Sequence, residues 1–422
     1  MKNVFIKYLI ISLSKKFEVT IFSDEKVKYH SKYIIEKYKE EKVDKFYNYL
    51  SNPLPSEKEK FYLLNSGKKN LIFKIFVNIK LIFSYLNFLP SKDYLYKIKY
   101  KNSSQYHNIL KNFDYIICDA RLSSLYNKNK RLIYEAIKNK NVKVFSWFYS
   151  WDNIYFNSII KSADYVFIWS KSFKKIVSKI HGYKSKQIIS IGPLQLDYLK
   201  KANLIKTSNK KKHILFACTY GKDANKTGDN FYIDEKLFIL KLSEFMMKLD
   251  KKIKIIVRLY PSADINDFKD LKKLKNIEIS DYGKIVNRRK KYSEKIRFEK
   301  NFDNKIKQIK DSTIVMSYGS TFNIEAAYLN KLVFHIDFSF RDKFDEKFKI
   351  FRNKMEYLNF LKFKSKNIIK NEKYFKQVLI DIFVKQKVQN YKLYGKKLKN
   401  IFCNELKESL SIHNLRKYIL DK

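Results

Sequence analysis

The chain has 422 residues, a length that suggests two domains, and 45% of them are hydrophobic, which excludes wholesale disorder. The formal net charge is +47, and nearly all of the 89 basic residues are Lys. Because proteins that read nucleic-acid sequence depend on Arg for bidentate base contacts, this composition argues against specific nucleic-acid binding. Three widely separated cysteines, Cys118, Cys218 and Cys403, exclude a disulfide framework or a zinc site and are typical of a reducing cytoplasm.

The first hundred residues are predicted to be mostly helical and charged. Val4 to Leu13 is almost continuously apolar, but ten residues are too few to span a bilayer. We expect a helix over residues 3–16 and then a strand over residues 18–23. Residues 71–89 form the most apolar window, and polar residues interrupt it near a helical period, which predicts an amphipathic helix. That helix is either part of the core or lies in a membrane interface.

Strand-like and helix-like runs alternate from about residue 113 onward, which predicts βαβ units and a parallel sheet. Residues 201–212 are polar and unpatterned, and we interpret them as an interdomain linker. The expected strands cover residues 115–118, 142–147, 165–169 and 188–191, and the expected helices cover residues 130–140 and 172–180.

A second α/β series begins at residues 213–220. A strand over residues 253–259 would deliver Arg258 to the carboxyl edge of a sheet, where ligands of open α/β sheets bind. A long polar loop is expected at the same edge over residues 221–234. Residues 284–300 are read either as a substrate-facing loop or as a solvated helix, and the chain after Arg341 is expected to be helical.

The stretch from Lys310 to Phe338 carries the strongest functional signal. It predicts a buried strand over residues 312–317, a turn containing Gly319, Ser320 and Thr321, a helix over residues 322–328 and a strand over residues 332–336. The helix start would offer hydroxyls and N–H groups to a phosphate. Glu325 follows one turn later and could accept hydrogen bonds from a ribose diol. The competing interpretation is a simple helix cap followed by a solvated acid.

The segment "DSTIVMSYGSTFNIEAAYLNKLVFHIDF" resembles the donor-binding segment of GT-B fold glycosyltransferases of bacterial surface-polysaccharide biosynthesis. The resemblance extends to "SWDN" from Ser150, "ADYVFIWSKS" from Ala163, "IGPLQLD" from Ile191 and "IVRLYPS" from Ile256. It implies an α/β fold with two Rossmann-like domains facing a cleft and C-terminal helices packing back across them. The implied domains are residues 1–200 on the acceptor side, which lack the usual first strand, and 213–380 on the donor side, with C-terminal helices over 381–422.

In such an enzyme, Arg258, Ser317, Gly319, Ser320, Thr321 and Glu325 would bind the donor. The base that accepts the acceptor's proton would be Asp152, with Asp119 as the second candidate, because both follow strands of the first domain. Asp152 could instead cap a following helix. No DxD motif follows a strand, so no metal or other cofactor is expected. Ser317 stands where a retaining enzyme's E-x7-E spacing would place a second Glu, so we expect inversion.

The expected partners are a nucleotide-sugar donor, a glycan or lipid-linked acceptor and an anionic membrane surface. The expected location is the cytoplasm, including the inner face of the cell membrane. Three alternatives remain open at this point. They are a polyol-phosphate transferase of the CDP-glycerol type, a nucleotide-sugar 2-epimerase that shares the double-Rossmann architecture, and a degenerate member without catalysis. His181 and His335 each stand alone beside an apolar run, so we expect them to be structural.

Overall fold

The structure is a computed structural model, and it divides the chain into two compact units. The first unit comprises Asn3–Gln195 and Glu405–Lys422, and the second comprises Leu196–Asn404. The residues whose structure is described are 13, 19–22, 33–36, 108, 110–120, 130–138, 141–155, 163–205, 213–219, 231–260, 263, 265–280, 302–341, 365–407 and 410–421. The expected helices over residues 3–16 and 71–89 and the segment 284–300 lie outside them, apart from Leu13.

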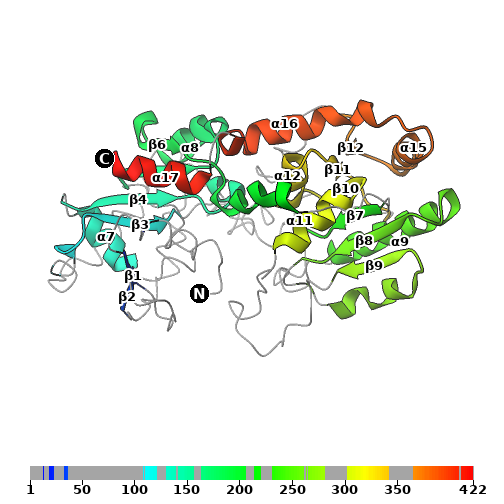
Figure 1. Cartoon of the computed structure of the whole chain (residues 1–422), viewed down its shortest axis with the longest axis horizontal. Coiled ribbons are helices and arrows are strands. Elements are labelled where there is room, and N and C mark those ends of the chain that lie inside the picture. Colours follow the sequence, from blue (N-terminus) through cyan, green and yellow to red (C-terminus); the bar gives the residue numbers. More distant parts are fainter. Residues whose placement is uncertain are drawn as a thin grey trace, which may run out of the picture. The chain divides into compact units, whose positions relative to one another are not determined.

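The first unit contains a four-stranded parallel sheet whose strands lie in chain order, and a separate two-stranded parallel sheet (Figure 1). The strands of the larger sheet are β3 (Tyr115–Asp119), β4 (Lys143–Trp147), β5 (Tyr165–Ile168) and β6 (Ile188–Ser190), and those of the smaller are β1 (Val19–Phe22) and β2 (Tyr33–Glu36). Its α-helices are α7 (Lys130–Lys138), α8 (Lys174–His181) and α17 (Ser411–Leu420), and its 3₁₀ helices are η2 (Trp151–Tyr155), η3 (Lys171–Phe173), η4 (Ser185–Gln187) and η10 (Glu405–Lys407).

The second unit is built on a six-stranded parallel sheet with the order β12-β11-β10-β7-β8-β9. Its strands are β7 (His213–Ala217), β8 (Lys254–Arg258), β9 (Ile277–Ser280), β10 (Ile314–Ser317), β11 (Leu332–Ile336) and β12 (Ile368–Ile369). Its α-helices are α9 (Phe231–Leu249), α11 (Phe302–Asp311), α12 (Thr321–Tyr328), α15 (Glu372–Phe383) and α16 (Lys392–Phe402), accompanied by η7 (Ile265–Lys273) and η9 (Val388–Tyr391). A further 3₁₀ helix, η5 (Leu194–Leu204), leads into this unit.

The strand order of the second unit is that of a Rossmann fold, 3-2-1-4-5-6, with β7 as its first strand. The chain moves outward from β7 through β8 and β9 in one direction, and from β10 through β11 and β12 in the other. The strand order therefore reverses between β7 and β10. The expected fold class, α/β with two Rossmann-like units, is confirmed by these two parallel sheets.

The helices of the second unit cover both faces of its sheet. Right-handed crossovers place α9 and α12 on opposite faces. The ring of Phe238 on α9 lies 5.0 Å from that of Phe375 on α15, whereas α12 packs with α16. The core strands β7, β10 and β11 are buried along their whole length, which explains why their sequences are apolar apart from one residue each.

The C-terminal helices are shared between the units. Helices α15 and α16 belong to the second unit, and α17 packs Leu415 and Ile419 into the core of the first unit beside Phe145 and Phe167. Figure 1 shows α17 in red beside the strands of the first unit. This agrees with the expected return of the C-terminal helices to both domains. Among the described residues, no helix combines the length and the apolar character needed to span a bilayer.

The expected linker over residues 201–212 begins with packed residues, because Ala202 is buried and Lys310 Nζ on α11 donates to the carbonyls of Ala202 and Ile205 at 2.8 and 2.7 Å. The rest of that segment, residues 206–212, lies outside the described residues. Two other expectations about elements were wrong. The expected loop over residues 221–234 ends earlier, since α9 begins at Phe231. The chain after Arg341 is not purely helical: Ile368–Ile369 form the sixth strand, two residues too short to give a periodic signal.

Candidate functional site

The turn between β10 and α12 has the predicted form. Ser320 is the N-cap of α12, with extended backbone angles and a side-chain Oγ that accepts from the N–H of Phe322 at 3.2 Å. Gly319 has a φ of 98°, a left-handed conformation that favours glycine. Its N–H donates to Ser317 Oγ at 3.1 Å. The turn therefore lies at the carboxyl end of β10, next to the point where the strand order reverses.

Part of the turn's hydrogen-bonding capacity is already used inside the chain. The N–H groups of Gly319, Phe322 and Asn323 donate to Ser317 Oγ, Ser320 Oγ and the Ser320 carbonyl, respectively. The hydroxyl of Ser317 donates in turn to Asn323 Oδ1 at 2.9 Å, and both side chains are fully buried. The buried side chain of Ser317 thus stabilises the turn through these two hydrogen bonds. A bound phosphate would depend correspondingly more on cationic side chains nearby.

Glu325 is buried, which contradicts the interpretation of a solvated acid. Its side chain is held by Lys305 of α11, whose Nζ donates to Oε1 at 2.8 Å. Oε2 lies 2.6 Å from the same Nζ, close enough for an ion pair, but it makes no hydrogen bond among the described residues. A carboxylate has about four acceptor sites, so the ion pair with a single ammonium does not use all of them. Glu325 therefore keeps a buried oxygen with acceptor capacity.

Arg258, at the end of β8, lies close to the first turn of α12. Its Cζ is 5.6 Å from the centre of the Phe322 ring, and Lys305 Nζ is 5.0 Å from the same centre. Arg258 Nη1 donates to Gln308 Oε1 at 2.6 Å, and Gln308 Nε2 donates to Ser280 Oγ at 3.2 Å. The guanidinium is thus oriented by α11 and β9. The structure brings the six expected donor residues to one end of the sheet.

Lys305 was not predicted from the sequence, although it is central to this group. It is one of many lysines, and its partner Glu325 stands 20 positions later in a different helix. Tyr198, another aromatic residue, adds its ring at 5.6 Å from Lys305 Nζ. A second missed set lies after β7 and β11, where Arg341 Nε donates to the buried Asp234 at 2.8 Å and Thr219 N–H donates to Glu235 at 2.5 Å. These bonds fix the neighbouring loop ends.

The two expected catalytic acids belong to the first unit, and both lie at the carboxyl edge of its sheet. Asp119 ends β3 opposite Trp147 and is only 1% exposed. Asp152 is half-buried in η2, which follows β4, and its Oδ1 is buried with no hydrogen-bond partner among the described residues. Since η2 begins at Trp151, Asp152 is inside that helix and does not cap it, contrary to the competing interpretation.

His181 is structural, as expected. Its Nε2 donates to the carbonyl of Ile154 at 2.7 Å, and the imidazole is buried, so α8 anchors the η2 segment that carries Asp152. His335 is fully buried within β11. Within the described ranges, no group of three or more His, Cys, Asp and Glu side chains is arranged to hold a metal ion.

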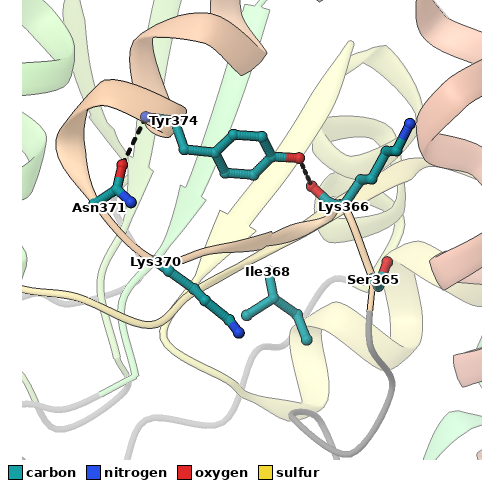
Figure 2. Close-up of a pocket in the computed structure, with 6 residues that line it drawn as sticks. All are labelled: Ser365, Lys366, Ile368, Lys370, Asn371 and Tyr374. Atoms are coloured by element: carbon teal, nitrogen blue, oxygen red, sulfur yellow. Dashed lines mark hydrogen bonds between the residues drawn. The ribbon is translucent and has the colours of Figure 1, made fainter.

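A pocket of about 450 Å³ lies elsewhere in the second unit, beside the edge strand β12 and the start of α15. Figure 2 shows Tyr374 donating its hydroxyl to the Lys366 carbonyl at 2.6 Å, and Asn371 capping α15 by accepting from the Tyr374 N–H at 2.8 Å. This pocket contains none of the expected site residues. Its remaining lining residues are Ser365, Ile368 and Lys370.

No protein-family model and no curated protein matches the chain. Among solved structures, S. aureus MnaA with UDP matches with a TM-score of 0.48 and 14% identity over 77% of this chain and 81% of that chain. The wall teichoic acid polymerase TagF matches with a TM-score of 0.44 and 15% identity over 76% of this chain and 77% of that chain. Neisseria meningitidis UDP-GlcNAc 2-epimerase bound to UDP-GlcNAc matches with a TM-score of 0.43 and 14% identity over 76% of this chain and 80% of that chain. All three scores are below 0.5, so the fold assignment rests on the strand order and the functional argument on this chain's own residues.

Proposed function

We propose that the second unit binds a nucleotide diphosphate where the strand order reverses between β7 and β10. Ligands of open α/β sheets bind at such a reversal, outside the carboxyl ends of the strands. The observation that carries the proposal is the group of residues placed there. The first turn of α12, Arg258 and the buried Glu325, with a carboxylate oxygen free of hydrogen bonds among the described residues, all belong to this end of the sheet.

Each of these groups suits one part of a nucleotide-diphosphate sugar. Arg258 would contribute charge-assisted hydrogen bonds to the diphosphate, and the hydroxyls of Ser320 and Thr321 would donate further hydrogen bonds to the same anion. Glu325 Oε2 would accept from a ribose hydroxyl. The diphosphate is the leaving group, so cations beside it stabilise the charge that develops as the glycosidic bond breaks.

The proposed reaction is transfer of the sugar to a hydroxyl of a surface glycan or lipid-linked acceptor, without a metal and with inversion. The acceptor oxygen attacks the anomeric carbon, the bond from that carbon to the diphosphate oxygen breaks, and the acceptor's proton passes to Asp152. A base must be half-exposed to reach a substrate and must have unused acceptor capacity. Asp152 meets both requirements better than the deeply buried Asp119.

A thermal-shift panel tests the proposal. UDP, CDP, GDP and CMP derivatives are added to the full chain, and a bound nucleotide raises the apparent stability by RT ln(1 + [L]/Kd). One nucleoside diphosphate is expected to stabilise the protein, and EDTA is expected to leave the transfer rate unchanged. Stabilisation by CDP-glycerol with none by sugar nucleotides would assign a polyol-phosphate transferase instead, and a panel without any shift would contradict the proposal.

The turn is tested by replacing both Ser320 and Thr321 with Ala. Nucleotide affinity should fall by about 1 to 3 kcal/mol, the range for hydrogen bonds to a charged partner. The matched control is Asn371→Ala, which removes the side-chain cap of α15 in the same unit and should leave the affinity unchanged. Calorimetry that finds equal nucleotide affinity in the double variant and the wild type would remove this turn from the site.

A further inference from the structure

The ion pair between Lys305 and Glu325 occupies the position that the proposed ligand needs. Lys305 Nζ contacts both carboxylate oxygens, at 2.8 and 2.6 Å, and the two side chains are 15% and 4% exposed. The ammonium also lies over the rings of Phe322 and Tyr198. In so enclosed a setting, an ammonium needs an anionic partner, because its hydration is largely lost.

A second cationic side chain lies beside this pair. Arg258 and Lys305 both lie within 5.6 Å of the Phe322 ring centre, and Glu325 holds Lys305. Two cationic side chains thus flank the first turn of α12, an arrangement that suits a ligand with more than one negative charge, such as a diphosphate.

We infer that Lys305 is an exchangeable phosphate-binding residue, held on Glu325 in the free protein and transferred to the diphosphate when a nucleotide binds. The inference rests on the proposed function for the nature of the ligand. The side chain of Lys305 is a flexible four-carbon stem carrying a compact charge with three donors, so it can change partner by rotating its side-chain bonds. The Phe322 ring beneath its Nζ belongs to the second residue of α12, next to Thr321.

This exchange makes the two halves of a nucleotide bind cooperatively. A phosphate alone draws Lys305 away and leaves Glu325 buried without its cation. A nucleoside alone adds a hydroxyl to Glu325 but gives Lys305 no second anion. Only a molecule that carries both a diol and phosphates satisfies both side chains at once. The pair would therefore select intact nucleotides against free phosphate and free nucleosides.

Inorganic pyrophosphate is the probe that separates the two roles, because it carries phosphate oxygens and no diol. Calorimetric titration compares the wild type with Glu325→Gln, which releases Lys305 with little change of shape. The Glu325→Gln variant is expected to bind pyrophosphate about tenfold more tightly than the wild type, a change within the range of one charge-assisted hydrogen bond. Adding Lys305→Met to Glu325→Gln should abolish that gain.

Lys307→Met is the matched control for Lys305→Met, because Lys307 is exposed on the same helix and its loss changes the net charge by the same amount. It should bind pyrophosphate as the wild type does. Equal or weaker pyrophosphate binding by Glu325→Gln would overturn the exchange, even if nucleotides stabilise the protein as proposed. Conversely, tighter binding in Glu325→Gln with no response to any nucleoside diphosphate would refute the proposed function and leave Lys305 as a phosphate-binding residue. Melting curves of every variant establish that the folded protein is being titrated.

Discussion

Asp152 and Asp119 follow neighbouring strands of the first unit, yet their surroundings suit different roles. Asp152 has a buried Oδ1 without a hydrogen bond among the described residues, and its segment is fixed by His181. Asp119 is almost completely buried, and its charge helps to raise the pKa of the adjacent Cys118 thiol. At the scale of single residues, the half-buried carboxylate with unused acceptor capacity is a better candidate for a base than the almost completely buried one.

The Asp152→Asn variant should therefore fold and bind nucleotide but lose a factor of about 10² to 10⁴ in turnover, the usual contribution of a positioned base. Asp119→Asn is the comparison variant. It should lower the melting temperature, and its loss of turnover should be much smaller than that of Asp152→Asn. Steady-state rates and nucleotide titrations separate the two effects. Full activity in Asp152→Asn would place the base elsewhere, and a product that retains the donor's anomeric configuration would exclude inversion.

The three cysteines give a pH-dependent prediction. All are buried, and burial raises the pKa values of Cys118 and Cys218 above the usual value, with Glu235 adding to the effect at Cys218. The thiolate is the reactive form, so a thiol reagent should modify none of them in the native protein and all three in denaturant. A thiol that reacts rapidly in the native state would contradict their burial.

The same shifts affect stability. A buried thiol keeps its proton in the folded state at pH values where the unfolded chain has lost it, so the folded state binds more protons. This contribution is fully present below a pH of about 8.5, the pKa of an unfolded cysteine, and declines as the pH rises further. Melting temperatures should accordingly fall on the alkaline side. Replacing Cys218 with Ala should flatten part of that fall.

The sequence was most informative where local rules decide the structure. Strand β10, the Ser320 cap and helix α12 were predicted within one or two residues, because a buried apolar run and a capping hydroxyl are local signals. The group of side chains around Glu325 was not predicted, because Lys305 comes from another helix and no neighbouring residue in the sequence distinguishes Lys305 from the other lysines. A pair of residues separated by 20 positions is a product of packing, which a single sequence does not display.

At the scale of elements, two glycines with positive φ offer a controlled comparison. Gly182 ends α8 with φ 74°, and a Cβ there would meet nothing within 4 Å. Gly192 follows β6 with φ 98°, and a Cβ there would lie 2.5 Å from Ser411 Oγ of α17. Both positions penalise any other residue through the backbone, but only Gly192 lets a second element approach closely.

Gly182→Ala should cost about 1 to 2 kcal/mol of unfolding free energy, the penalty of the left-handed conformation. Gly192→Ala should cost about 1 to 3 kcal/mol more, because the new methyl group overpacks the contact with α17. Denaturant unfolding measures both. Adding Ser411→Gly to Gly192→Ala should recover part of the excess but none of the backbone penalty. Equal costs at the two glycines would mean that α17 does not depend on this close approach.

Elements also show where a pattern is too short to be read. The strand β12 has only two residues, and its pairing with His335 and Ile336 of β11 is what defines it. The start of α9 at Phe231 places Asp234 in its first turn and Glu235 directly after it, where they accept hydrogen bonds from Arg341 and Thr219, which follow two different strands. Such tertiary partners extend a helix into a stretch whose polar composition predicts a loop.

At the scale of the whole molecule, the chain order and the structural units do not coincide. The last residues, from Glu405, return to the first unit, where Glu405 Oε1 accepts from the Lys171 N–H at 2.8 Å and from the Ser190 hydroxyl at 2.6 Å. Asn414 Nδ2 donates to the Ile191 carbonyl at 3.0 Å. The general plan followed from alternating strands and helices, but the positions at which the chain enters and leaves each unit depend on these distant contacts.

The net charge of +47 is the property of the whole chain with the clearest consequence for its location. A strongly positive surface attracts anionic headgroups, and salt screens this attraction over a Debye length of about 10 Å at ~0.1 M. We therefore expect the full chain to float with anionic vesicles at low salt and to be released as salt rises, whereas zwitterionic vesicles should not retain it. Indifference to lipid charge would remove the electrostatic basis for membrane association.

If anionic vesicles do bind, replacing Phe76 and Phe83 with Ser tests the apolar window over residues 71–89. Release from the vesicles with an unchanged melting temperature indicates an interfacial helix, and unfolding indicates a helix of the core.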